Sequence, residues 1–290
     1  MRLMGNRFEI SVVGNDSVWV DSCVNAAITE INRVEKLLST FSDDSQINEI
    51  NRNAGIKPVK VNAEIFRLVE RALKISELTF GTFDITYNAI DTNVHPAKIE
   101  RDSVKFTNYK NVQISEVNTT VFLTEKGMRI GFGGLIKGYA ADRAKYVLQL
   151  LGVSSGVINA GGDLLTWGLQ PGNAPWTIAS ADPDRGSQPF SNINISNMAV
   201  ATSGNFEKNV TISSKKYTHN VDAKKGFPVS VLRSVSIVSP TAELSDAMAT
   251  PVMVMGIRTG LDLINQIKGI ACIIIDDLDK LYTSSNIKIR

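Results

Sequence analysis

The sequence has few of the residues that bind soft metals or form disulfides: it contains 2 Cys and 2 His in 290 residues. Cys23 and Cys272 stand near opposite ends of the chain, and His95 and His219 are widely separated, so no zinc-binding spacing and no CxxC redox pair can be formed. A Cys- or His-rich metal site is therefore excluded, and any metal must have oxygen ligands. Cys272 lies in an apolar run and Cys23 in a helical pattern, so we expect both thiols to be buried and inert.

The sequence also lacks an excess of one charge and a long apolar run. It has 31 Lys and Arg against 29 Asp and Glu, a net charge of +2, so the strong positive field of a nucleic-acid-binding protein is missing and we predict no nucleic-acid partner. No run approaches the roughly 20 apolar residues that cross a bilayer, so we predict no transmembrane segment in this chain. With 43% hydrophobic residues, the composition is that of a globular protein.

Hydrophobic periodicity predicts both strands and helices. Alternating apolar residues predict a strand over 7–13, and helical spacing predicts helices over 24–38 and from the capping residue Asn62 to a stop at Gly81. Further strands are predicted over 121–124, 128–132, 157–160, 176–181, 198–202, 234–238 and 270–275. A further helix is predicted over 135–151 and a helical region over 243–267. Strands and helices mix without a regular βαβ alternation, which indicates an α+β fold of one unit or two subdomains.

Two glycine-rich segments are candidate ligand sites. Residues 131–138 form a glycine-rich turn before a helix, where free N–H groups and Lys137 favour a phosphate or pyrophosphate. The segment fits neither the Rossmann nor the P-loop pattern, and a tight strand-to-helix turn with a surface lysine is the alternative. Residues 159–163 come directly after the apolar pair Val157-Ile158, and their Gly-Gly pair suits either close approach of a planar ligand or an ordinary hairpin turn.

Three further segments carry polar groups suited to chemistry. Asp246 and Thr250 are four residues apart in a helical pattern, so both oxygens can reach one hard cation such as Mg²⁺, although such a pair is more often a solvated helix edge. Pro251 predicts a kink beside them. His219 suits proton transfer near neutral pH, although a lone His usually has a structural role. Residues 201–204, a strand end with two hydroxyls and a glycine, are generic.

Taken in chain order, these segments resemble the family of FAD:protein FMN transferases known as ApbE. The match spans nearly the whole chain, through residues 3–8, 38–41, 44–45, 50–51, 81–85, 133–134, 137–142, 159–163, 201–204, 245–247 and 249–250. The resemblance implies an ApbE-like α+β fold, related to the T-fold, with mixed sheets packed against helices in two intimate subdomains. It also implies that residues 1–290 form a single flavin transferase domain.

The resemblance implies an enzyme that uses Mg²⁺ as cofactor and FAD as substrate. It would cleave the pyrophosphate, attach FMN by a phosphoester bond to a Thr or Ser of an acceptor protein, such as a subunit of an electron-transfer complex, and release AMP. The alternatives are a Mg²⁺-dependent FAD pyrophosphatase and a flavin-binding protein with impaired catalysis. Family members are commonly lipid-anchored at the cell envelope, so we expect that location for the full-length protein, or a cytoplasmic one if Met1 is the native start.

The resemblance also assigns site residues. The predicted FAD contacts are Met4, Phe41, Thr82, Phe83, Asp84, Gly131, Lys137, Asn159, Gly161, Gly162, Ser203, Gly204 and Asn220. The predicted Mg²⁺ ligands are Asp246, Thr250 and the Gly134 carbonyl. We predict that His219 is the base for the acceptor hydroxyl, that Asp222 orients it, and that Lys137 adds positive charge at the pyrophosphate.

The sequence departs from the family pattern at several points. Gly131 stands where many members have Asp, and Ala223 and Lys225 replace a Pro and a Thr that usually follow the His segment. The stretch 84–112 is shorter than usual, and Pro251 replaces a small or apolar residue. These departures concern the site more than the fold.

Overall fold

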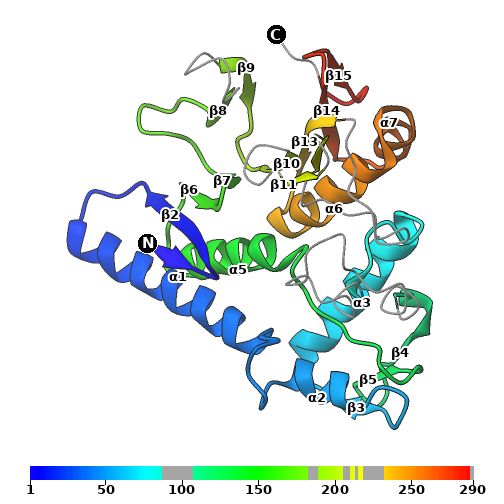
Figure 1. The fold of residues 1–290 in the computed structure, drawn as a ribbon. Helices are drawn as coiled ribbons and strands as arrows, with labels where there is room; N and C mark the ends of the chain where they lie inside the picture. Colours follow the sequence, from blue (N-terminus) through cyan, green and yellow to red (C-terminus); the bar gives the residue numbers. More distant parts are fainter. Residues whose placement is uncertain (87–106, 182–188, 205–209, 213–214, 218–231, 288–290) are drawn as a thin grey trace. The chain divides into compact units, whose positions relative to one another are not determined.

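The computed structural model describes residues 1–86, 107–181, 189–204, 210–212, 215–217 and 232–287 (Figure 1). The chain divides into two compact units. The first comprises Met1–Arg33, Leu135–Asn209 and Val231–Arg290, and the second comprises Val34–Gly134 and Val210–Ser230. Helices and antiparallel sheets occur together, so the predicted α+β fold class is confirmed. The assignment of 1–290 to a single domain stays a prediction.

An eight-stranded sheet forms the centre of the first unit. Its order is β1-β2-β6-β7-β10-β13-β14-β15, and each neighbouring pair is antiparallel. The strands are β1 (Arg2–Leu3), β2 (Asn6–Val12), β6 (Gly156–Ala160), β7 (Asp163–Trp167), β10 (Ala199–Gly204), β13 (Leu232–Ser239), β14 (Ala271–Asp276) and β15 (Leu281–Thr283). A separate antiparallel pair, β8 (Thr177–Ala181) and β9 (Pro189–Asn194), also belongs to this unit.

Three helices pack against this sheet. The helix α5 (Ile136–Leu150) contacts β6, α6 (Ala242–Met255) contacts β10 and β13, and α7 (Ile257–Asn265) contacts β14. The pair α5 and α6 also lie against each other (Figure 1). Buried apolar side chains such as Leu165, Val235 and Met248 form the core between the sheet and the helices. Their burial holds α5 and α6 on the sheet.

Two tight hairpin turns lie at the same end of the sheet. Met4 and Gly5 join β1 to β2, and Gly161 and Gly162 join β6 to β7, all four with positive φ (51°, 71°, 68° and 103°). Positive φ at both central residues is the conformation that twists a two-residue hairpin correctly. Because β2 and β6 are antiparallel neighbours, the start of one lies beside the end of the other. The hairpin interpretation of residues 159–163 is therefore confirmed.

The second unit contains a smaller sheet and short helices. Its sheet has the order β3 (Val59–Lys60), β5 (Thr120–Leu123), β4 (Val112–Ser115), and β11 (Val210–Ile212) pairs with β12 (Lys215–Tyr217). Its helices are α2 (Gln46–Arg52), α3 (Ala63–Leu78) and the 3-10 turn η3 (Tyr109–Asn111), and the long α1 (Ser17–Leu37) ends in it. Asn62 caps α3 as predicted, because its side chain accepts a hydrogen bond from the Glu64 N–H.

One predicted element was wrong, and one predicted helical region is divided. Residues 128–132 form no strand, because the Asn51 side chain donates to the Ile130 carbonyl (3.1 Å) and accepts from the Ile130 N–H (2.7 Å), so a side chain takes the place of a partner strand. The predicted helical region 243–267 is confirmed and consists of two helices, since Gly256 with φ 80° ends α6 and precedes α7. α6 itself continues through Pro251, and the kink predicted there stays a prediction.

Both cysteines are buried, as expected, at 2% exposure for Cys23 and 0% for Cys272. Burial raises the pKa of the Cys272 thiol to about 12, which keeps it protonated and unreactive at neutral pH. In the part of the chain that the structure describes, no helix combines the length and the hydropathy that a membrane span requires.

Candidate functional site

The end of the large sheet that carries the two hairpin turns gathers most of the site residues predicted in the first unit. Asn159 is the penultimate residue of β6, and Gly161 and Gly162 form the next turn. β10 ends at the same side with Ser203 and Gly204, because β7 and β10 are antiparallel neighbours. The Gly162 N–H donates to the Asn159 side chain (2.8 Å), which holds the turn in place. The sheet topology therefore brings together residues that lie far apart in the sequence.

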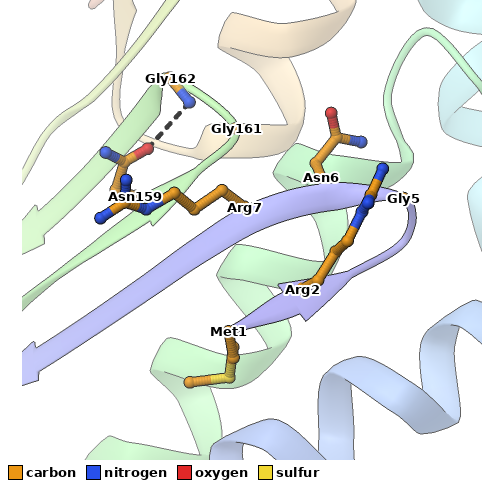
Figure 2. A pocket seen from close by; sticks show the side chains of 8 residues that line it. All are labelled: Met1, Arg2, Gly5, Asn6, Arg7, Asn159, Gly161 and Gly162. Atoms are coloured by element: carbon orange, nitrogen blue, oxygen red, sulfur yellow. Dashed lines mark hydrogen bonds between the residues drawn. The ribbon is translucent and has the colours of Figure 1, made fainter.

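An open pocket of about 800 Å³ lies at these two turns (Figure 2). It is lined by Met1, Arg2, Gly5, Asn6, Arg7, Asn159, Gly161 and Gly162. Arg2 and Arg7 are direct cross-strand partners in the β1–β2 pair, so their two cationic side chains lie on the same face of the hairpin. Arg7 also pairs with Glu9 (2.5 Å), and the Asn6 amide donates to the Met4 carbonyl (2.8 Å). Guanidinium groups, amides and open backbone suit an anionic ligand.

A charged cluster adjoins this turn. The Lys137 ammonium at the start of α5 lies 2.6 Å from the Asp163 carboxylate and 2.9 Å from the Asp246 carboxylate, and the three side chains are 23%, 11% and 9% exposed. The second oxygen of Asp163 accepts from the Thr202 N–H (3.1 Å), and that of Asp246 accepts from the Gly138 N–H (3.0 Å). Two carboxylates thus share one ammonium, and the charges of these three side chains sum to −1.

The cluster changes the acidity of its members. Burial by itself would lower the pKa of Lys137, but the charges of Asp246 and Asp163 and their hydrogen bonds raise it above its ordinary value. Burial raises the pKa of Asp163, and the negative charge of Asp246 adds to this against the opposing charge of Lys137. Lys137 is therefore a permanent cation at neutral pH, not a proton carrier, and it is not the surface lysine of the alternative interpretation.

Asp246 and Thr250 lie one turn apart on α6, and the Thr250 hydroxyl is 2.9 Å from the Ser203 hydroxyl on β10. Sequence reasoning named both α6 residues and Ser203 but left Asp163 and Thr202 out of the site. The signal available for Asp163 was its place at the first position of a strand after Gly-Gly. Its partner Lys137 is 26 positions away, so no local pattern links the two residues.

The segment 137–142 fixes α5 against α6. An added Cβ at Gly138 would lie 2.1 Å from the Ala242 carbonyl oxygen, so only glycine allows the two helices to approach so closely. One turn later, the Asp142 carboxylate accepts hydrogen bonds from the Ala242 N–H (2.9 Å) and the Glu243 N–H (2.8 Å) at the N-terminus of α6. Both contacts set the position of α6, which carries Asp246.

The Asp142 contact predicts a pH-dependent stability. Burial raises the pKa of Asp142 to about 6 from an ordinary 3.8, against the two backbone hydrogen bonds that lower it. Because the folded chain holds this proton more tightly than the unfolded chain, the contribution is fully present below about pH 3.8 and is lost as pH rises through about 6. The free energy of unfolding of the unchanged chain relative to Asp142→Asn should fall by about 2 kcal/mol between about pH 4.5 and about pH 7.

Urea denaturation of both proteins at a series of pH values measures this difference. Asp142→Asn is the suited comparison because its amide oxygen still accepts one of the two N–H groups while the titrating group is gone. A difference that is constant across this pH range contradicts the prediction.

In the second unit the structure brings together two other predicted segments. The Phe83 ring lies against Gly134, with 3.4 Å between a ring carbon and the place of a Cβ on that glycine, and the Gly131 N–H donates to the Ile85 carbonyl (2.9 Å). The Asp84 carboxylate accepts from the backbone N–H of Tyr109 (2.9 Å). Thr82 precedes this segment, and Phe41 is 96% exposed.

Three predicted residues, His219, Asn220 and Asp222, lie outside the described residues. Their assigned roles stay predictions.

The donor chemistry of the first unit suits a hard cation. Among the described residues no group of three or more His, Cys, Asp and Glu side chains is placed to hold a metal ion. Asp246 and Thr250 instead offer a carboxylate and a hydroxyl from successive turns of α6, and Asp246 belongs to the cluster with a net negative charge. Mg²⁺ typically binds to only a few oxygen ligands of a protein and retains several of its waters.

Comparison with known proteins connects this site to a family. The model of the ApbE family matches residues 4–274. A protein of Klebsiella pneumoniae (strain 342) named FAD:protein FMN transferase is 26% identical, and the alignment covers 98% of this chain and 88% of that protein. One of the same name from Treponema pallidum (strain Nichols) is 26% identical over 92% of this chain and 81% of its own length.

Solved structures agree with the family match. The crystal structure of the ApbE protein from Thermotoga maritima superposes with a TM-score of 0.86 at 27% identity, covering 98% of this chain and 95% of that one. The flavin transferase ApbE from Vibrio cholerae, at 23% identity, has the same fold with a TM-score of 0.85 over 98% of this chain and 96% of that one. A family model that matches nearly the whole sequence and a fold shared from end to end lead to one assignment: this chain belongs to the ApbE family.

Proposed function

We propose that this chain is a FAD:protein FMN transferase. The hydroxyl oxygen of an acceptor Thr or Ser bonds to the FMN phosphorus of FAD, the bond from that phosphorus to the AMP oxygen breaks, and AMP leaves with the electron pair while a base takes the hydroxyl proton. The observation that carries the proposal is the Lys137–Asp163–Asp246 cluster, which lies beside a cationic pocket in a member of the ApbE family. The acceptor is proposed to be a subunit of an electron-transfer complex.

The pocket and the cluster supply the binding groups that this substrate needs. FAD carries a dianionic pyrophosphate, and the pocket presents Arg2 and Arg7 on one face of the β1–β2 hairpin. Lys137 keeps its charge at neutral pH, so it can attract a phosphate throughout the reaction. Because the ammonium is fixed before substrate arrives, little reorganisation is needed when charge develops on the leaving group.

Mg²⁺ is proposed as the metal of this site. Asp246 and Thr250 would hold it through their side-chain oxygens, together with the Gly134 carbonyl, which stays a prediction from the resemblance. When bound, Mg²⁺ would supply positive charge that stabilises the pyrophosphate and the departing AMP. The base is proposed to be His219 with Asp222, and the location to be the cell envelope.

Flavin transfer is tested directly with purified components. The chain is incubated with FAD, Mg²⁺ and a candidate acceptor subunit, and intact-mass spectrometry of the acceptor is combined with chromatography of the nucleotides. The expected result is an acceptor heavier by one phosphoester-linked FMN and an equal amount of AMP. AMP and free FMN without any acceptor indicate a pyrophosphatase instead, and bound FAD without AMP indicates a flavin-binding protein; either result contradicts the proposal.

A further inference from the structure

Within the cluster, Asp163 and Asp246 both accept a hydrogen bond from the same Lys137 ammonium. The ammonium lies 2.9 Å from Asp246 Oδ1 and 2.6 Å from Asp163 Oδ2. Asp246 is also the carboxylate proposed to hold the cation. A lysine ammonium and a divalent cation placed on the same carboxylate repel each other strongly in a partly buried site.

The Asp163 carboxylate has a second contact besides the one with Lys137. It is the first residue of β7, only 8% of its surface is exposed, and its Oδ1 accepts from the Thr202 N–H (3.1 Å) on the adjacent β10. The carboxylate is therefore held by the sheet itself, independently of Lys137. This gives the ammonium a second, immobile anion within reach.

From this geometry we infer that Asp163 is a positioning residue that retains the Lys137 ammonium when a divalent cation occupies Asp246. With Asp163 present, Lys137 can give up its contact with Asp246 and keep a full salt bridge, so the cation does not compete with an otherwise unpaired ammonium. Without Asp163, Asp246 is the one carboxylate of the cluster left to Lys137, and a cation can bind only at the expense of that pair. The inference rests on the proposed function for the identity of the cation site.

The inference separates two effects of one carboxylate. A negative charge near a cation site strengthens cation binding by direct attraction, whatever Lys137 does. An effect that operates through Lys137 must instead depend on whether Lys137 is present. A double-mutant cycle over Asp163 and Lys137 measures this dependence.

The experiment titrates the full chain with Mn²⁺ alone and records free Mn²⁺ by electron paramagnetic resonance, since Mn²⁺ accepts the same oxygen ligands as Mg²⁺. The proteins are the unchanged chain, Asp163→Asn, Lys137→Gln and the double variant. Asn keeps the acceptor for the Thr202 N–H and removes only the charge. If this variant does not fold, Asp163→Ser, a smaller uncharged acceptor, replaces it in the cycle.

Asp163→Asn is expected to raise the dissociation constant for Mn²⁺. The fold-increase should be about tenfold larger when Lys137 is present than in the Lys137→Gln background, which is a coupling typical of one salt-bridge network. Equal factors in the two backgrounds, within about twofold, overturn the inference. Lack of Mn²⁺ binding by the unchanged chain overturns it too, together with the metal site. Failure of FMN transfer in the acceptor assay, with the coupling present, counts against the proposed function alone.

Asp16→Asn is the matched control. Asp16 also accepts backbone N–H groups, from Val18 (2.9 Å) and Trp19 (3.3 Å), and it follows the end of β2 opposite to the hairpin turns. The substitution removes the same charge from an exposed site before α1, so Mn²⁺ affinity should stay within about twofold of the unchanged chain. A larger change means that total charge, and not the Lys137 contact, governs the affinity.

Discussion

Gly138→Ala should lower the free energy of unfolding by about 3 kcal/mol, at the upper end of the range for overpacked sites. The added Cβ would lie 2.1 Å from the Ala242 carbonyl oxygen, 2.4 Å from its carbon and 2.8 Å from the Glu243 nitrogen. All three are backbone atoms, so no side chain can rotate away, and α5 and α6 must separate. Differential scanning calorimetry of the two proteins measures the change.

The same substitution should also disturb the site. Gly138 donates its N–H to Asp246 (3.0 Å), and Lys137 precedes it, so separation of α5 from α6 lengthens both contacts to Asp246. Gly133→Ala is the matched control for stability, because a Cβ there meets no atom within 4 Å. It should change the free energy of unfolding by less than about 0.5 kcal/mol. Equal effects of the two substitutions would show that Gly138 has no special packing role.

Asp246→Ala should reduce the rate of AMP release from FAD by more than about 100-fold, since it removes a carboxylate proposed to hold Mg²⁺ and leaves Lys137 paired with Asp163 alone. It also leaves the Gly138 N–H without its acceptor. The measurement is AMP release from FAD in the presence of the acceptor at several Mg²⁺ concentrations, because a lost ligand lowers the apparent affinity for the metal as well as the maximal rate.

Thr250→Ser is the comparison for this prediction. The hydroxyl is kept, so its contact with Ser203 and its oxygen for the cation remain, and the loss of rate should be less than about tenfold. Thermal denaturation of each variant shows whether the fold persists. Full activity of a folded Asp246→Ala protein would eliminate the metal assignment while leaving the family assignment intact.

The sequence by itself determined those features that depend on neighbouring residues. Asn62 predicted the start of α3 because a short polar side chain can cap the N–H groups beside it. Gly161 and Gly162 indicated a hairpin turn as one of two interpretations, and both residues have the positive φ that glycine adopts without strain. Ordered short motifs along the chain were also enough to identify the family, since a motif is a local string of residues.

The prediction failed where a distant residue decided the outcome. The run 128–132 has the composition of a strand, but the Asn51 amide, 79 positions from Ile130, satisfies that backbone instead. Likewise, Gly138 reads as part of a glycine-rich turn, while its actual requirement comes from the Ala242 carbonyl on another helix. Neither contact leaves a signal in the residues next to it.

The charged cluster is the clearest case of what only the tertiary structure decided. Lys137 is 26 positions from Asp163 and 109 from Asp246, and the three meet because the order and register of the sheet place the start of β7 beside α5 and α6. Residue type alone indicated a cation at Lys137 and a metal ligand at Asp246 as separate features, and it gave Asp163 no role. Because the three side chains are largely buried and Lys137 lies within 3 Å of both carboxylates, the charge of each group affects the pKa values of its neighbours.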